Sequence, residues 1–201
     1  MSKKPVIVFE GVEGSGKTHH IMNVSRYLKK KKIDHIKIRE PGGNPNSEKI
    51  RKLILNKKSK FNRITDLLLY LAARSENIQN LKKFYKKKVI LIDRFTDSTI
   101  AYQHYGFGVD IKLINKINET LLKNFKVDYT ILNIVNKTNM NKRLILRKSL
   151  NRYDKFTNKF YEKVQKGFIK LAIRNKKKYK IINSNLDIRY NQDQIIQSIN
   201  K

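Results

Sequence analysis

The chain has 201 residues, which suits one domain with a sizeable core, and no cysteine, which excludes disulfides and thiolate metal sites and fits a reducing cytoplasm. No apolar run reaches the length of a membrane helix, so we expect a cytoplasmic protein with no membrane partner. The net charge of +30, from 46 basic and 16 acidic residues, comes largely from lysine runs among asparagine and isoleucine, a pattern that favours biased codon usage over a specific nucleic-acid partner.

The first predicted strand, residues 5–10, leads directly into the sequence GVEGSGKT at 11–18, and a helical pattern follows. In such a loop the glycines turn backbone N–H groups toward phosphate oxygens, the lysine reaches the β- and γ-phosphates, and the threonine hydroxyl can ligate Mg²⁺. The positive end of the helix dipole points at the same anion. We therefore expect a nucleoside triphosphate and Mg²⁺ to bind at Gly11, Gly14, Ser15, Gly16, Lys17 and Thr18.

Four further β-branched runs follow, separated by helical patterns, at residues 35–40, 88–93, 128–135 and 179–184. Near-continuous apolar strands that alternate with helices predict a three-layer α/β protein around a five-stranded parallel sheet. Ligands bind beyond the carboxyl ends of such strands, where GVEGSGKT, REPGG (39–43) and DRF (93–95) all fall. We expect a single domain over residues 1–201, with one mobile segment in the polar stretch at about 147–159.

A phosphate-binding loop alone is compatible with ATPases, GTPases and kinases, so the other motifs have to distinguish them. The chain resembles the thymidylate kinases in the order and spacing of five motifs: FEGVEGSGKT (9–18), REPGG (39–43), LYLAAR (69–74), DRFTDSTIAYQ (93–103) and KRLILRKSLNRYD (142–154). This resemblance implies a P-loop nucleoside monophosphate kinase fold with a short lid at about 147–159. It also implies transfer of the γ-phosphoryl group of ATP to dTMP in dTTP biosynthesis, with Mg²⁺, by a homodimer.

Joining two phosphates requires cations at the acceptor, at the transferred phosphoryl group and at the metal. The resemblance assigns Arg51 and Arg94 to the acceptor phosphate, and both can present bidentate donors. Asp93 is expected to bind Mg²⁺, partly through water, together with Thr18, and Lys17 completes this part of the catalytic set. No general base is required, because the attacking atom is already an anionic phosphate oxygen.

The family places its remaining catalytic arginine either in the phosphate loop or in the lid. This loop has Gly14 at that position, so Arg147 and Arg152 in the lid become the candidates, as in the bacterial-type variant. A lid that closes over ATP would bring one or both guanidinium groups to the transferred phosphoryl group and exclude water. Arg143, one helical turn before Arg147, would either line the adenine side of the ATP site or be solvated.

Three residues are expected around the sugar and the cleft of the dTMP site. The resemblance implies that Glu13, inside the phosphate loop, contacts the sugar 3′-hydroxyl and selects deoxynucleotides. Tyr102 is expected to pack against the sugar. Glu40 ends a strand ahead of a Pro-Gly-Gly turn, which would turn its side chain into the cleft.

The thymine base is expected to lie against LYLAAR and STIAYQ. Tyr70 and Arg74 are four residues apart on one predicted helix, so they can share a face, with Tyr70 stacking on the base and Arg74 donating to thymine O4. Thr99 and Gln103, also four apart, would present polar groups to the base. The family usually has Phe where this chain has Tyr70, whose hydroxyl needs a partner. Many relatives have Arg where Phe107 stands, so we expect no ionic contact there.

Two alternative functions remain at this point. A deoxynucleoside kinase would combine a phosphate loop with a base for a hydroxyl acceptor, and it would not need the pair Arg51 and Arg94. An ATPase that binds nucleic acid would fit the charge, and it should show a basic groove with interleaved aromatic residues.

Overall fold

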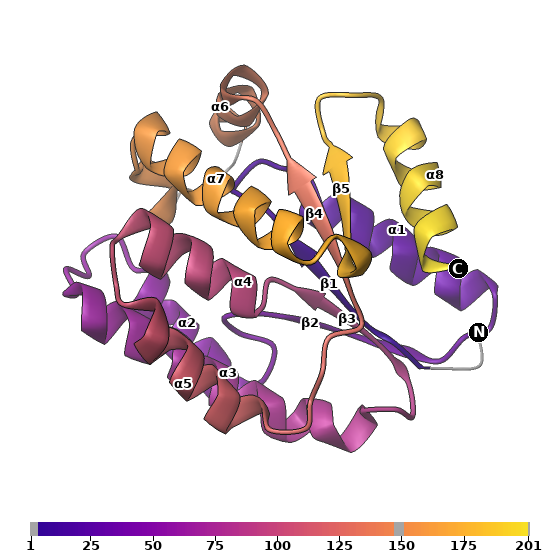
Figure 1. Cartoon of the computed structure of the whole chain (residues 1–201), viewed down its shortest axis with the longest axis horizontal. Helices are drawn as coiled ribbons and strands as arrows, with labels where there is room; N and C mark the ends of the chain where they lie inside the picture. Colours follow the sequence, from indigo (N-terminus) through magenta and orange to yellow (C-terminus); the bar gives the residue numbers. More distant parts are fainter. Residues whose placement is uncertain (1–3, 147–150, 201) are drawn as a thin grey trace.

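The computed structural model describes residues 4–146 and 151–200, and it confirms the three-layer α/β architecture (Figure 1). Its central layer is a five-stranded parallel sheet with the strand order β2-β3-β1-β4-β5. The strands are β1 (Val6–Glu10), β2 (His35–Arg39), β3 (Val89–Asp93), β4 (Tyr129–Ile134) and β5 (Tyr179–Asn183). No strand end differs by more than one residue from the sequence prediction.

Helices connect the strands and cover both faces of the sheet. They are α1 (Lys17–Lys30), α2 (Pro45–Leu55), α3 (Arg63–Phe84), α4 (Thr96–Thr99), α5 (Ile111–Leu122), α6 (Lys137–Ile145), α7 (Asn158–Arg174) and α8 (Ile188–Ile199). A π-helix, η1 (Ile100–Gly106), continues α4, and the 3₁₀ helices η2 (Tyr153–Lys155) and η3 (Lys176–Lys178) flank α7.

The strands are buried from both sides, which explains why they read as continuous apolar runs. Successive residues of a strand point to opposite faces, so Phe9 packs with Ile21 of α1 and Ile195 of α8, whereas Val8 packs with Ile78 of α3. Figure 1 shows α1 and α8 together on one side of the sheet, and α3, α4 and α5 on the other.

The strand register brings three loops to one edge of the sheet. Arg39 of β2 lies opposite Asp93 of β3, which lies opposite Phe9 of β1. The chain leaves these positions into REPGG, DRF and the phosphate loop respectively. The predicted meeting of the three motifs at the carboxyl ends of the strands is therefore confirmed.

The predicted lid lies between α6 and α7. Residues 147–150 are outside the described residues, while Tyr153 is buried and packs in a core cluster with Phe156 at its edge. Mobility of this segment stays a prediction. Within residues 4–146 and 151–200, no helix is long and apolar enough to cross a membrane.

Candidate active site

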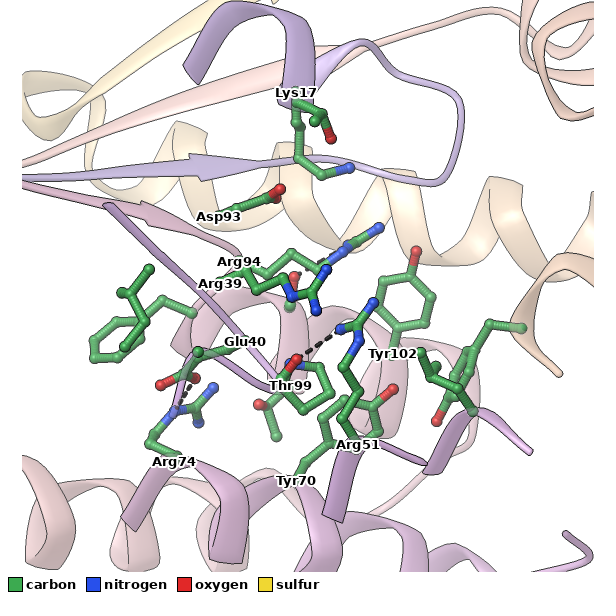
Figure 2. Close-up of a pocket in the computed structure, with 18 of the residues that line it drawn as sticks. Lys17, Arg39, Glu40, Arg51, Tyr70, Arg74, Asp93, Arg94, Thr99 and Tyr102 are labelled. Carbon is green, nitrogen blue, oxygen red and sulfur yellow. Dashed lines mark hydrogen bonds and ion pairs between the residues drawn. The ribbon is translucent and has the colours of Figure 1, made fainter. Parts of the chain in front are cut away.

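A cavity of about 550 Å³ opens at the carboxyl ends of β1, β2 and β3. Its wall is formed by the phosphate loop, the REPGG turn, α2, α3, the segment after β3 and the residues just before α7. Figure 2 shows Lys17 at one side of this cavity and Tyr70 at the opposite side, with arginine side chains between them. The lysine of the predicted phosphate loop and an aromatic ring therefore lie on opposite sides of a group of arginines.

The phosphate loop has the backbone conformation that its glycines permit. Gly11 has a φ of 140°, and a Cβ built there would lie 2.3 Å from the carbonyl oxygen of Asn133, so no other residue fits. Lys17, the first residue of α1, donates from Nζ to the carbonyl oxygens of Gly11 and Val12, both at 2.8 Å. Burial, followed by the charge of Arg94, lowers the pKa of Lys17 to about 7. The ammonium group thus lies inside the loop, where an anion would stabilise its charge.

Arg94 lies between the phosphate loop and the side of the cavity where the acceptor phosphate is expected. Its Nη1 donates to the carbonyl oxygen of Gly11 and its Nη2 to Oε1 of Glu13, each at 2.8 Å. The guanidinium group also lies over the ring of Tyr102, 5.4 Å from the centroid. The Arg94 guanidinium is held by the phosphate loop and faces the cavity. It can therefore bind an acceptor phosphate that lies close to the phosphates held by that loop.

Two further arginines face the same space. Figure 2 shows the guanidinium groups of Arg39, Arg51 and Arg94 gathered in the middle of the cavity. Arg51 donates to the carbonyl oxygen of Pro41 at 2.6 Å, and Arg39 pairs with Glu48. Burial, followed by the charge of Arg39, lowers the pKa of Arg51. Crowded cations of this kind are stabilised when an anion binds among them.

Glu13 points into the protein and is bound at both oxygens. Oε1 accepts from Arg94, and Oε2 accepts a short hydrogen bond from the hydroxyl of Tyr102. Burial alone would raise the pKa of Glu13, but the charges of Arg94 and Lys17 outweigh it and lower the pKa. Glu13 is therefore an ionised carboxylate between the phosphate loop and the predicted sugar position.

The residues predicted to contact the base and the sugar come together on α3, α4 and η1. Tyr70, Thr99, Tyr102 and Gln103 all line the cavity. The ring of Tyr70 packs edge-on against that of Tyr153, with the centroids 5.9 Å apart. Thr99 is 2% exposed, and its Oγ1 has no hydrogen-bond partner among the described residues. A buried hydroxyl of this kind is a ready partner for a ligand that enters the cavity.

Arg74 and Glu40 line the cavity as a buried ion pair. Arg74 Nε lies 2.8 Å from Glu40 Oε2, and its Nη1 donates to Asn118 at 2.7 Å. The two side chains are only 2% and 4% exposed. Burial raises the pKa of Glu40, and Arg74 opposes this shift. Glu40 thus orients Arg74, and contact between Arg74 and thymine O4 stays a prediction.

Of the two predicted lid arginines, Arg152 lies among the described residues. Arg147 is outside the described residues. Arg152 donates to Asp66 of α3, and its guanidinium group lies over Phe61 and Tyr153. Arg143 donates to the carbonyl oxygens of Gly14 at 2.9 Å and Ser184 at 2.6 Å, so it is fixed beside the phosphate loop and not free in solvent.

Comparison with known proteins decides the family. The family model described as Thymidylate kinase matches residues 9–195. The chain belongs to the thymidylate kinase family. A thymidylate kinase from Mycoplasma capricolum is 36% identical over 198 residues, with 96% of this chain and 93% of the relative covered. One from Ligilactobacillus salivarius is 37% identical over 196 residues, covering 94% and 92%. The crystal structure of thymidylate kinase from Ehrlichia chaffeensis has a TM-score of 0.79 at 29% identity and covers 98% of both chains.

Family membership makes the chain a P-loop nucleoside monophosphate kinase that uses ATP, and two oxygen donors in the cavity fit Mg²⁺. Thr18 and Asp93 line the cavity and supply a hydroxyl and a carboxylate, the oxygen ligands that Mg²⁺ prefers. Figure 2 shows the carboxylate of Asp93 on the same side of the cavity as Lys17. Two protein ligands are enough, because Mg²⁺ in kinases is bound largely by nucleotide phosphates and water.

The structure adds residues to this thymidylate kinase site that the sequence did not predict. Arg39, Ser98, Asn151 and Tyr153 line the cavity, and Asp66, which is not in the lining, accepts from Arg152. Arg39 begins the REPGG motif, so its place at a strand end could have drawn attention to it. Tyr153 lies in the lid motif, but its contact with Tyr70 joins residues far apart in the chain and had no sequence signal.

Phe107 packs against two aromatic rings near the start of α7. Its ring lies 5.4 Å from Phe156 and 4.8 Å from Phe160, measured between centroids. Phe107 therefore belongs to an aromatic cluster between the end of η1 and the start of α7.

Proposed function

We propose that the protein transfers the γ-phosphoryl group of ATP to dTMP, giving dTDP and ADP for dTTP biosynthesis. The main support is the position of Arg94, which hydrogen-bonds Gly11 and Glu13 of the phosphate loop and lines the cavity in which dTMP would bind. A cation shared by both sides offsets the repulsion between two polyanions.

The reaction requires positioning and neutralisation of charge. Lys17 would bind the β- and γ-phosphates, while Arg51 and Arg94 would hold the acceptor phosphate, whose oxygen attacks the γ-phosphorus as the bond to the leaving ADP oxygen breaks. Bound Mg²⁺ would neutralise phosphate charge, held by Thr18 and Asp93. Arg147 and Arg152 would reach the transferred phosphoryl group when the lid closes. For Arg152 this requires release from Asp66.

The acceptor site favours a thymidine nucleotide. Tyr70 would stack on the base, with Arg74, Thr99 and Gln103 at its polar edge. Tyr102 and Glu13 would meet the sugar, and Glu40 would hold Arg74. The unpartnered hydroxyl of Thr99 supports a ligand at this edge.

The hydrogen bonds of Glu13 make a nucleoside kinase the less favoured function. A hydroxyl acceptor needs a carboxylate that is free to take a proton. Both oxygens of Glu13 are instead bound, by Arg94 and by Tyr102. The arrangement supports a phosphate acceptor, which needs no base.

Exposed apolar side chains on α2 and α3, two helices that pack against each other, support the homodimer that the family resemblance implies. Leu53, Ile64 and Leu68 are 52%, 46% and 50% exposed, and the last two are four residues apart on one face of α3. We propose this face as the dimer contact, in a cytoplasmic enzyme. Light scattering should give the mass of two chains for the wild type, and of one chain for Leu68→Asp.

Product analysis tests the proposed reaction. The enzyme, ATP, Mg²⁺ and dTMP should give ADP and dTDP in equal amounts, separated by ion exchange and identified by mass. Arg94→Ala should nearly abolish dTDP formation while the circular dichroism spectrum still shows the wild-type fold, with a lower melting temperature because Glu13 loses its partner. Wild-type turnover of this variant would remove Arg94 from the acceptor site.

A further inference from the structure

Glu10 is a buried carboxylate that the reaction above does not use. It is the last residue of β1 and has no exposed surface. Its Oε1 accepts from the backbone N–H of Phe95 at 2.7 Å and of Ser98 at 3.2 Å. Its Oε2 accepts from the Ser98 hydroxyl at 2.6 Å. All three donors belong to the segment that follows β3, so Glu10 ties this segment to the strand that carries the phosphate loop.

Ser98 continues the connection to Arg94. Its hydroxyl donates to Glu10 and accepts from Arg94 Nη1 at 3.2 Å. The same Nη1 donates to the carbonyl oxygen of Gly11. Arg94 is therefore fixed on one side by the phosphate loop and on the other by a hydroxyl whose own orientation is set by Glu10.

The backbone at Arg94 also needs support. Arg94 has a φ of 67°, in the left-handed region that residues other than glycine rarely adopt. Such a conformation persists only where neighbouring contacts hold it in place. The hydrogen bond from the N–H of Phe95, the next residue, to Glu10 is one such contact.

We propose that Glu10 is a positioning residue for phosphoryl acceptance: through Ser98 and the backbone after β3, it sets the direction of Arg94 toward the acceptor phosphate. This inference rests on the proposed role of Arg94. Glu10 touches no substrate in this scheme, and its effect on the acceptor passes through Arg94.

A second buried carboxylate provides a matched control. Asp97 and Glu10 line one small cavity of about 280 Å³ behind the segment. Asp97 accepts from the hydroxyl of Tyr179 at 2.5 Å, and no hydrogen bond joins it to Arg94 in residues 4–146 and 151–200. Burial raises the pKa of both carboxyls, that of Glu10 to about 7 with the charge of Asp97 as the next cause. Asp97→Asn removes a charge from the same cavity and none of the hydrogen bonds between Glu10, Ser98 and Arg94, and by lowering the pKa of Glu10 it favours the ionised carboxylate that accepts from Ser98.

Calorimetry measures the affinity for dTMP of the wild type and of variants along the chain of contacts. Glu10→Gln and Ser98→Ala test the proposal, and Ser98→Thr and Asp97→Asn are the controls. Arg94→Ala and the double variant Arg94→Ala/Ser98→Ala show whether the effect passes through Arg94. Ser98→Ala and Glu10→Gln should each weaken dTMP binding about tenfold, as expected for losing a hydrogen bond to a charged group. The KM for ATP should stay within about twofold of wild type, since the phosphate loop keeps its own contacts. Ser98→Thr should restore dTMP affinity, and Asp97→Asn should not change it.

The double variant separates positioning from general support. If Ser98 acts through Arg94, Ser98→Ala will cause no further loss in the Arg94→Ala background. An equal loss in both backgrounds, or the same loss in Asp97→Asn, would overturn the inference. A dTMP affinity of Arg94→Ala equal to wild type would instead contradict the proposed role of Arg94 itself. If Glu10→Gln does not fold, as judged by its melting curve, the two Ser98 variants decide the question.

Discussion

Arg152 of the lid donates a hydrogen bond from Nη2 to Oδ1 of Asp66 on α3, and the two side chains are 15% and 5% exposed. Asp66 also accepts from the hydroxyl of Tyr153, so one carboxylate holds two neighbouring lid residues. The lid arginine is therefore bound on the acceptor side of the site, and it must exchange this partner for a phosphate to act in catalysis.

Arg152→Lys should lower kcat more than it raises the KM for either substrate. Lysine keeps the charge but cannot present two parallel donors to a phosphoryl group in the transition state. We expect a fall in kcat on the order of a hundredfold, since arginines at transferred phosphoryl groups contribute at least this much. Steady-state kinetics measures it, and a change confined to KM would assign Arg152 to ground-state binding. The same comparison applies to Arg147→Lys.

Asp66→Asn should loosen the lid from α3 without altering the sheet. The amide is a poorer acceptor for Arg152 and Tyr153, and losing these bonds should cost about 1–3 kcal/mol of the free energy of unfolding. Limited trypsin digestion with mass mapping should show faster cleavage between residues 142 and 159 than in wild type. Glu162→Gln, which changes an exposed acid on α7, is the control. Equal cleavage in both variants would mean that Asp66 does not hold the lid.

Tyr70→Phe should leave the KM for dTMP within about twofold of wild type. The ring that is proposed to stack on thymine and that packs against Tyr153 stays, and only the hydroxyl is lost, which should cost roughly 1 kcal/mol of stability or less. Tyr70→Ala removes the ring and should raise the KM strongly. Steady-state kinetics with melting curves tests both. A large KM increase in Tyr70→Phe would show that the hydroxyl takes part in acceptor binding.

ATP binding should take up a proton above pH 7. The pKa of Lys17 is lowered to about 7 in the free enzyme, and neighbouring phosphates would raise it again. At pH 8 most of the free enzyme would therefore carry a neutral Lys17, and roughly one proton should bind with each ATP. Affinity should fall, by up to about tenfold per unit, as the pH rises above 7.

Calorimetry in two buffers of different ionisation enthalpy measures this proton uptake. Arg does not titrate in this range, so Lys17→Arg should bind ATP without taking up a proton, whatever its affinity. A buffer-independent enthalpy for wild type at pH 8 would mean that Lys17 is already charged before ATP binds.

The sheet and the phosphate loop could be predicted because their signals are local. Strands buried on both faces must be apolar throughout, so each appears as a continuous run, and the glycines of GVEGSGKT fix the loop directly. The order β2-β3-β1-β4-β5 has no such signal, since it depends on which helix crosses which face.

The partners of the charged side chains were the part that sequence could not supply. Arg74 was expected to meet a base, and the structure shows it bound to Glu40 and Asn118, which come from distant segments. Arg152 is bound to Asp66, 86 positions away. Burying such groups requires that each charge finds a partner, and only the packed structure determines which one it is.

The measurement that tests the central claim most directly is ADP release with ATP and Mg²⁺, comparing dTMP, dUMP, thymidine and single-stranded DNA as the second substrate. If the protein is a dTMP kinase, dTMP should strongly stimulate ADP release, and thymidine or DNA should stimulate it little. If thymidine stimulates ADP release and dTMP does not, the phosphate-acceptor site around Arg94 is contradicted. If only DNA stimulates ADP release, the charge of +30 serves nucleic-acid binding.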